Sequence, residues 1–300
     1  MKTREIAVAH LLVVLSIIAA LTVTSFAQSN SNANTLQPPM TEKKTKTTKI
    51  HDETMIDDYF WLREKTNPEV IRHLEAENGY AEAMMKPTAA LQLKLYNEMV
   101  GHIKETDRSV PYRWGGYFYY TRTEQGKQYP INCRMKGSLD AKEEVVLDQN
   151  EMAKGLKFFS IGAFVPSDDG NLLAYSTDTT GYRQYKLQFK DLRTGQVLPE
   201  TFERVGSVAW ATDNKTIFFT TEDAVTKRSD KFFRHVLGSD QTDLIFEEKD
   251  ELFDIGAGRS RDKAVILLGS ESKTSTEWRY LPANDPTAEL KIISPREADH

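Results

Sequence analysis

The feature that most constrains this chain is a repeat of β-type runs with a period in the mid-forties. Three polar turns each carry an aspartate and precede a strongly apolar run; these aspartates, Asp169, Asp213 and Asp262, lie 44 and 49 residues apart. The apolar runs that follow are 172–175, 217–219 and 265–268. A further run, a polar turn and a short apolar strand complete each unit. About four short strands in a period of roughly 40–50 residues are typical of a β-propeller blade.

The repeat predicts about four blades, at residues 109–150, 155–200, 204–248 and 252–296. A β-sandwich with accidental spacing is the alternative, but three series of runs stay in phase, which favours the propeller. The three aspartates should occupy equivalent hairpin turns, and Tyr175, Phe219 and Leu268 should be core residues. The predicted fold is mostly β, a partial β-propeller preceded by an α-helical N-terminal segment.

The helical segment is expected between residues 49 and 108. Asn67-Pro68-Glu69 is a helix start, with a capping residue, a proline in the first turn and an acid near the positive helix end. Pro87 should break this helix, and Thr88 is positioned to cap a second one. Two helices of about fifteen residues are predicted. Their apolar positions at helical spacing are Val70, Leu74, Ala81 and Met84 or Met85 in the first, and Leu91, Leu95 and Met99 in the second.

The N-terminus reads as a secretory signal peptide over residues 1–27. Lys2 and Arg4 precede an apolar run at 11–23, and Ser25 and Ala27 are small residues suited to a cleavage site. An uncleaved membrane anchor is the alternative, but a span needs about 20 apolar residues and this run is shorter. Residues 28–39 are Ser/Asn-rich and end in Pro-Pro, so we expect a flexible linker over residues 28–48. The protein is therefore expected to be exported to the periplasm or secreted, without stable membrane insertion after cleavage.

The composition excludes several classes of protein and of binding partner. The net charge of -5 argues against nucleic acid as the main partner, which would favour a basic face. Hydrophobic content of 39% and charged content of 28% exclude a polytopic membrane protein and a wholly disordered chain. Cys133 is the single cysteine, so neither an intrachain disulfide nor a multi-cysteine metal site is possible.

A search for catalytic motifs finds none. There is no G-x-S-x-G elbow, and Ser260 lies in an expected turn without that pattern. No Gly-rich phosphate loop follows a strand and opens a helix. No histidines pair at metal-ligand spacing; they are His10, His51, His73, His102, His235 and His300. We therefore assign no catalytic, cofactor-binding or metal-binding residue.

Two polar clusters remain. The acidic cluster comprises Glu247, Glu248, Asp250 and Glu251; it could attract cationic ligands, but a solvated turn between blades is favoured. Residues 214–216, Asn-Lys-Thr, match a glycosylation acceptor in form. That match lies at a tight turn and matters only in a eukaryotic secretory route.

An ordered set of motifs provides a family resemblance. Residues 57–64, DDYFWLRE, resemble the D-x-Y-x-W-L-R motif near the start of the prolyl oligopeptidase family. A Pro-led helix follows, as in that family, with EAEN at 75–78 and then Tyr80. Further matches are ETD at 105–107, Val110-Pro111, GKQYP at 126–130 and LDQN at 147–150. The segment 178–191 and the SPRE ending at 294–297 resemble the oligopeptidase B branch most.

The resemblance implies a seven-bladed propeller over the active site of a C-terminal α/β-hydrolase domain that carries a Ser-Asp-His triad. It implies peptide substrates, cleavage after Lys or Arg, and a propeller that filters substrates by size. This sequence corresponds to the helices and about four blades, and the hydrolase domain has no counterpart in it. No family catalytic residue has a matching position, and a fragment or truncated gene product is expected.

Two functions therefore remain open. The first is the N-terminal part of an exported serine oligopeptidase, in which case the 300 residues alone should be inactive. The second is a non-catalytic propeller module that binds a peptide or protein partner. The downstream reading frame would distinguish them.

Overall fold

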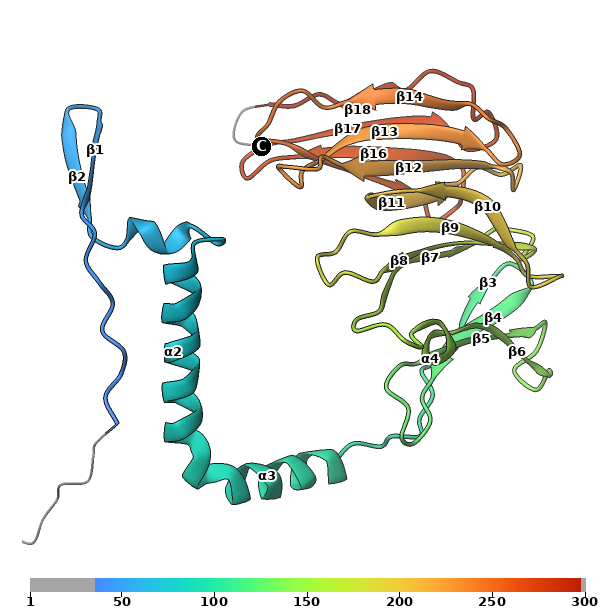
Figure 1. Cartoon of the computed structure of the whole chain (residues 1–300). Coiled ribbons are helices and arrows are strands. Elements are labelled where there is room, and N and C mark those ends of the chain that lie inside the picture. The colour runs from blue at the N-terminus through green and yellow to red at the C-terminus, as the bar shows by residue number, and fades with distance from the viewer. Residues whose placement is uncertain (1–35, 298–300) are drawn as a thin grey trace, which may run out of the picture. The chain divides into compact units, whose positions relative to one another are not determined.

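The computed structural model describes residues 36–297, in two compact units that divide between Ile103 and Lys104. The first unit holds a two-stranded hairpin, two short 3-10 helices and two α-helices (Figure 1). Their bounds are β1 Lys46–Ile50, β2 Glu53–Asp57, η1 Phe60–Arg63, α2 Pro68–Met85, η2 Lys86–Thr88 and α3 Ala89–Gly101. The hairpin overlaps the last residues of the expected linker. No helix among the described residues is long and apolar enough to cross a membrane.

The start of α2 is the predicted one. The Asn67 side chain accepts a hydrogen bond from the Glu69 backbone N–H at 2.9 Å, and Pro68 occupies the first turn. Within this unit Trp61 and Val70 are buried, and the Trp61 indole donates to the Glu42 carbonyl at 3.0 Å. The motif at 57–64 thus anchors the segment that precedes the helices.

The junction of the two helices differs from the prediction. Thr88 does not cap α3, because its hydroxyl donates back to the Met85 carbonyl at 2.7 Å. Residues 86–88 form the 3-10 turn η2, and Ala89 continues in helical geometry. A proline in the first turn of a helix loses no intrahelical hydrogen bond, so Pro87 is accommodated and the chain needs no separate cap.

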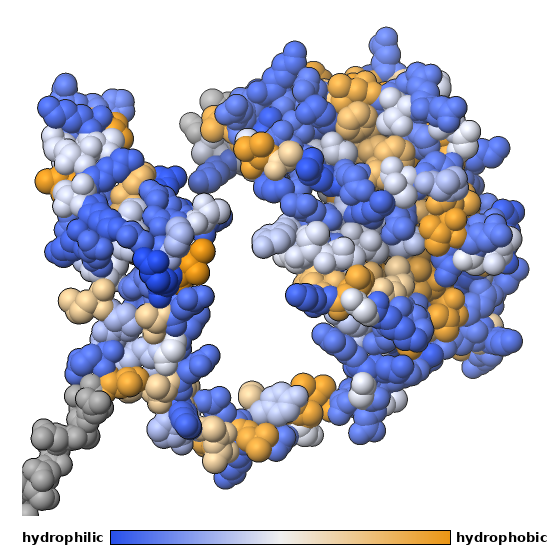
Figure 2. All heavy atoms as spheres, in the orientation of Figure 1, coloured by the Kyte–Doolittle hydropathy of each residue, from blue (hydrophilic) through white to orange (hydrophobic). Residues whose placement is uncertain are grey.

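The apolar faces of the two helices are exposed within this unit, where the only buried residue of α2 is Val70 and α3 has none. Figure 2 shows apolar side chains among polar ones over the helical segment. The exposed large side chains include Ile71, Leu74, Met84, Met85, Leu91, Leu95, Tyr96 and Met99. Such a surface is expected to pack against further protein.

The second unit consists of four antiparallel four-stranded sheets, each formed by consecutive strands (Figure 1). Blade 1 holds β3 Tyr112–Trp114, β4 Tyr117–Arg122, β5 Ile131–Lys136 and β6 Glu143–Asp148. Blade 2 holds β7 Ser160–Pro166, β8 Leu172–Asp178, β9 Lys186–Asp191 and β10 Val197–Phe202. Blade 3 holds β11 Val205–Trp210, β12 Thr216–Glu222, β13 Ser229–Val236 and β14 Thr242–Glu247. Blade 4 holds β15 Asp254–Arg259, β16 Val265–Glu271, β17 Thr276–Pro282 and β18 Lys291–Ser294, and one helical turn, α4 Gln149–Met152, joins blades 1 and 2.

The predicted repeat is confirmed. Asp169, Asp213 and Asp262 all lie in the turn between the first and second strands of their blades. Each carboxylate accepts a backbone N–H from two residues ahead, and the residue after each aspartate has a positive φ. Tyr175, Phe219 and Leu268 are at most 2% exposed. The expectation of about four blades of a partial β-propeller is therefore correct.

The sheets pack face to face, and the first strand of each lies on the inner edge. Strand β11 contacts β7 of the blade before and β15 of the blade after. Apolar clusters fill the spaces between sheets; between blades 2 and 3 the Phe189 and Trp210 rings meet edge to face at 5.9 Å. The fourth strands β10, β14 and β18 lie on the exposed outer side. This is the arrangement of propeller blades around a central axis.

We predict that Gly170→Ala destabilises the protein more than Gly137→Ala. Both glycines have φ of +71°, so both variants incur a similar left-handed strain of about 1–2 kcal/mol. A Cβ on Gly170 would lie 2.5 Å from Tyr117 Cε2, whereas a Cβ on Gly137 meets nothing within 4 Å. Overpacking adds about 1–3 kcal/mol at Gly170. Urea unfolding of both variants measures this, and equal losses would contradict the close packing.

Candidate functional site

The turns between the first and second strands form one end of the blades, which we call the first-turn end. They comprise residues 115–116, 167–171, 211–215 and 260–264. The opposite end carries the loops between second and third strands and the connections from one blade to the next; we call it the loop end. The first strand of each blade runs from the loop end to the first-turn end.

The turn of blade 2 is built around Asp169. Its carboxylate accepts from the Ser167 hydroxyl at 2.6 Å and from the Asn171 N–H at 3.0 Å, and Gly170 provides the left-handed residue. Burial opposes ionisation of Asp169, but these hydrogen bonds outweigh it and lower its pKa. Because Asp169 is occupied by the turn itself, the carboxylate of Asp168 is left for contacts with other blades.

This turn packs tightly on blade 1. The Trp114 indole donates to the Pro166 carbonyl at 3.2 Å. A Cβ on Gly115 would lie 2.5 Å from the Asp168 carbonyl oxygen, so only glycine fits there. The Arg134 guanidinium, stacked over the Tyr117 ring at 4.0 Å, also donates to the Gly170 carbonyl.

The same turn is joined to blade 3. The Asp169 N–H donates to the Asn214 side-chain oxygen at 3.3 Å, and the Trp210 indole donates to the Val165 carbonyl at 2.8 Å. The Asn214 amide also donates to the Thr212 carbonyl. Asn214, the asparagine of the triplet that resembles a glycosylation acceptor, therefore lies in a tight turn, as expected, and its side chain binds the turn of blade 2.

At the loop end, the acidic cluster forms the connection from blade 3 to blade 4, as expected, but Glu248 is not solvated. It is 4% exposed and accepts a hydrogen bond from Arg296 at 2.6 Å. Burial opposes its ionisation, but the hydrogen bonds from Arg296 and the Asp250 N–H, with the charge of Arg296, together outweigh burial and lower the pKa of Glu248. Arg296 in turn lies over the Phe253 ring at 3.9 Å. Three of the four acidic residues pair with cations of this chain, Glu247 with Lys231 and both Glu248 and Asp250 with Arg296.

Arg228 completes this connection. Its guanidinium donates to the carbonyls of Glu248, Asp250 and Phe253 at 3.0, 3.2 and 2.8 Å. Three backbone acceptors of an irregular segment are thereby satisfied. The connection is consequently an ordered part of the blade interface.

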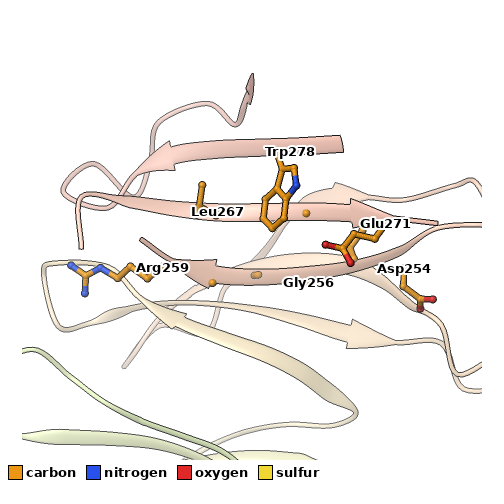
Figure 3. Close-up of a pocket in the computed structure, with 10 residues that line it drawn as sticks. Asp254, Gly256, Arg259, Leu267, Glu271 and Trp278 are labelled. Atoms are coloured by element: carbon orange, nitrogen blue, oxygen red, sulfur yellow. The ribbon is translucent and has the colours of Figure 1, made fainter. Parts of the chain in front are cut away.

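The outward face of blade 4 carries a pocket of about 440 Å³ (Figure 3). The Trp278 ring lies against Gly269, where a Cβ would stand 3.0 Å away, and Leu267 lies beside it. Asp254 and Glu271 stand together at one end of the pocket and Arg259 at the other. Asp254 and Glu271 are direct partners in the β15–β16 register, and neither has an ion-pair partner in the described part of the chain.

Ser260, His235 and His73 have structural contacts. Ser260 donates to Asp262 at 2.6 Å within its turn. His235 is buried, with Nδ1 bonded to the Gln241 carbonyl at 3.0 Å. His73 lies 3.1 Å from the Thr41 hydroxyl, and His10 and His300 lie outside the described residues. No group of three or more potential metal ligands of the His, Cys, Asp or Glu type occurs among residues 36–297.

Cys133 is fully buried in blade 1. Burial, with Glu143 nearby, raises the pKa of its thiol to about 11. Because the thiolate is the nucleophile, a thiol in this environment is unreactive at neutral pH.

Sequence reasoning missed the residues that join turns across blades, namely Trp114, Asp168, Arg259 and Lys263. A signal was present in the repeat. Asp168 stands one residue before the repeated aspartate, where the other two units have Thr212 and Arg261. A charged residue at a position where the equivalent residues of the other repeats differ in charge indicates a contact specific to that blade.

The fold and these contacts define a β-propeller, and comparison with known proteins identifies its family. Residues 38–300 match the family described as prolyl oligopeptidase, N-terminal beta-propeller domain. The chain therefore belongs to the prolyl oligopeptidase family, as the resemblance predicted.

Particular relatives extend this result. Dipeptidyl aminopeptidase BI of Pseudoxanthomonas mexicana is 38% identical over 304 residues, which cover 94% of this chain and 42% of the relative. Protease 2 of Moraxella lacunata is 35% identical over 82% of this chain and 37% of its own length. The structure of oligopeptidase B from Leishmania major has a TM-score of 0.80 and 31% identity over 88% of this chain and 40% of that protein. The chain thus spans about two fifths of the length of these relatives.

We predict that Arg296→Ala destabilises the protein by about 1–3 kcal/mol at pH 7, because it leaves Glu248 buried without its counter-charge. In the wild type the pKa of Glu248 is lower in the folded state than its value of about 4.3 in the unfolded chain. The ionised Glu248 therefore stabilises the fold at pH values above about 4.3, and this stabilisation is lost as the pH falls through the folded-state pKa. In the variant burial should raise that pKa, so protonation relieves the defect.

The deficit of Arg296→Ala should therefore shrink as pH falls toward 4, measured by urea unfolding at several pH values. Arg193→Ala serves as the control, since it removes the exposed pair with Asp191, in which the Arg193 side chain is 63% exposed. That variant should change stability little. A pH-independent deficit in Arg296→Ala would contradict the role given to Glu248.

Proposed function

We propose that this chain supplies the helices and four propeller blades of an exported serine oligopeptidase that hydrolyses short peptides after Lys or Arg. The observation that carries the proposal is the agreement of residues 38–300 with the family propeller, together with the TM-score of 0.80 to an oligopeptidase B. Export is supported by the signal-peptide pattern at 1–27, which lies outside the described residues.

The chemistry would belong to an α/β-hydrolase domain outside these 300 residues. There a serine attacks the peptide carbonyl, a histidine takes and returns its proton, and an aspartate orients the histidine. The exposed apolar faces of α2 and α3 offer a surface on which such a domain could pack. The blades would limit the size of the peptides that reach the triad.

The outward face of blade 4 fits the same proposal. It presents Leu267, Trp278 and several glycines, and the pocket between them is large enough to receive side chains of another sheet. A further blade packed there would bury this face as blade 4 buries that of blade 3. The relatives, more than twice as long as this chain, have the length for further blades.

A second candidate function is removal of dipeptides from free N-termini. It is favoured by the relative named dipeptidyl aminopeptidase BI, which matches 94% of this chain at 38% identity. The two activities differ in the substrate's N-terminus, because an aminopeptidase must bind a free ammonium group near the cut bond. A non-catalytic binding module is the alternative to both.

We predict that the full-length protein cleaves an N-blocked peptide p-nitroanilide ending in Arg, and that a serine-directed inhibitor abolishes the cleavage. Residues 28–300 alone should show no hydrolysis and associate in solution, because they supply no triad and expose apolar faces. An Ala-ended substrate is the control. Cleavage restricted to dipeptide substrates with a free N-terminus would favour the aminopeptidase, and no cleavage of either would favour the binding module.

A further inference from the structure

Blade 4 reaches past blade 3 at the first-turn end. Arg259 Nη1 donates to Asp168 Oδ2 at 2.8 Å, and Lys263 Nζ donates to Asp168 Oδ1 at 2.7 Å. Lys263 Nζ also lies 4.0 Å from the centroid of the Trp114 ring in blade 1. These four side chains therefore connect blade 4 with blades 1 and 2, neither of which precedes it directly in the chain.

Local hydrogen bonds hold the side chains of Arg259 and Trp114, and Asp168 stands in a stabilised turn. Arg259 is 7% exposed, and its Nε and Nη2 donate to the Lys263 carbonyl at 3.0 and 2.9 Å. The Trp114 indole is fixed by the Pro166 carbonyl. Asp168 stands in the turn that Asp169 stabilises. Charge-assisted hydrogen bonds between groups fixed in this way are stronger than those of freely moving surface pairs.

The position of these contacts matters because the first strands form the inner edge of the blades. A contact between blades that are not neighbours has to cross the space in front of that edge, which in a propeller is the central channel. We infer that Trp114, Asp168, Arg259 and Lys263 form a plug that closes the channel at the first-turn end. Substrate peptides then reach the channel only from the loop end. This consequence rests on the proposed peptidase function.

The charge of the plug supports this direction of entry. Two cations and one carboxylate give the plug a net positive charge, which repels peptides that carry Lys or Arg.

The contact itself is tested in the full-length protein with a carbodiimide, which couples a carboxylate directly to an amine in contact with it. We expect a cross-link between Asp168 and Lys263, detected by mass spectrometry of the proteolysed protein. Lys263→Gln should lose this cross-link and retain that between Lys104 and Asp107, a surface pair at 2.7 Å. Absence of the Asp168–Lys263 product from folded wild type, with the control product present, would overturn the plug.

The barrier is tested by the ratio of kcat/KM for a long peptide to kcat/KM for a short chromogenic substrate. The double variant Trp114→Ala/Lys263→Ala should raise this ratio several-fold, because a second entrance opens. Asp243→Asn, which breaks the pair with Arg234 inside blade 3, should leave it unchanged. Lys263→Ala alone replaces the double variant if the latter does not fold.

An unchanged ratio in the folded plug variant would contradict the barrier. Inactivity of the wild type toward both substrates would instead reject the proposed function, and the cross-link would still decide whether the plug exists. The two failures are therefore distinguishable.

Discussion

Packing of one sheet face against the next is the constraint on which this structure depends. A four-stranded sheet with two apolar faces needs a neighbour on both sides, and burial of those faces is the main favourable term in folding. Between blades 2 and 3 this burial includes Phe189, Trp210 and Phe219. Between blades 3 and 4 it includes Phe218 and Phe232, whose stacked rings lie 5.6 Å apart. The blades hence form a row in which each stabilises the next.

Face-to-face packing fixes the inner and outer strands, and thereby makes the two ends of the row different. At the first-turn end the tight turns of neighbouring blades lie close together, which Gly115 and Gly170 allow. There Asp168 forms ion pairs with two cations of blade 4. Longer connections occupy the loop end, where Arg228 binds backbone carbonyls of the connection between blades 3 and 4 and Arg296 pairs with the buried Glu248. In a propeller, residues that bind ligands are expected in the loops and turns at these two ends, because the faces of the sheets between them are buried by packing.

The repeat was readable from sequence because its signals are local. A turn aspartate and an apolar run a few residues later recur in phase, and both follow from hairpin geometry. The hairpin at 46–57 was missed, since its Thr/Lys-rich strands are exposed and show no alternation of apolar and polar residues. The environment of Glu248 was misjudged because Arg296 is 48 residues away, and the Asp168–Lys263 contact spans 95 residues. Pairs at such separations leave no local pattern.

We propose that these blades are part of a longer row whose next member covers blade 4. Leu267→Cys tests it most directly, because residue 267 lies on the outward face and Cys133 is too buried to compete for a thiol reagent. Labelling at residue 267, followed by mass spectrometry, is compared between the 300-residue chain and the full-length protein. The account predicts rapid labelling in the chain and strong protection in the full-length protein. Equal labelling in both would contradict it.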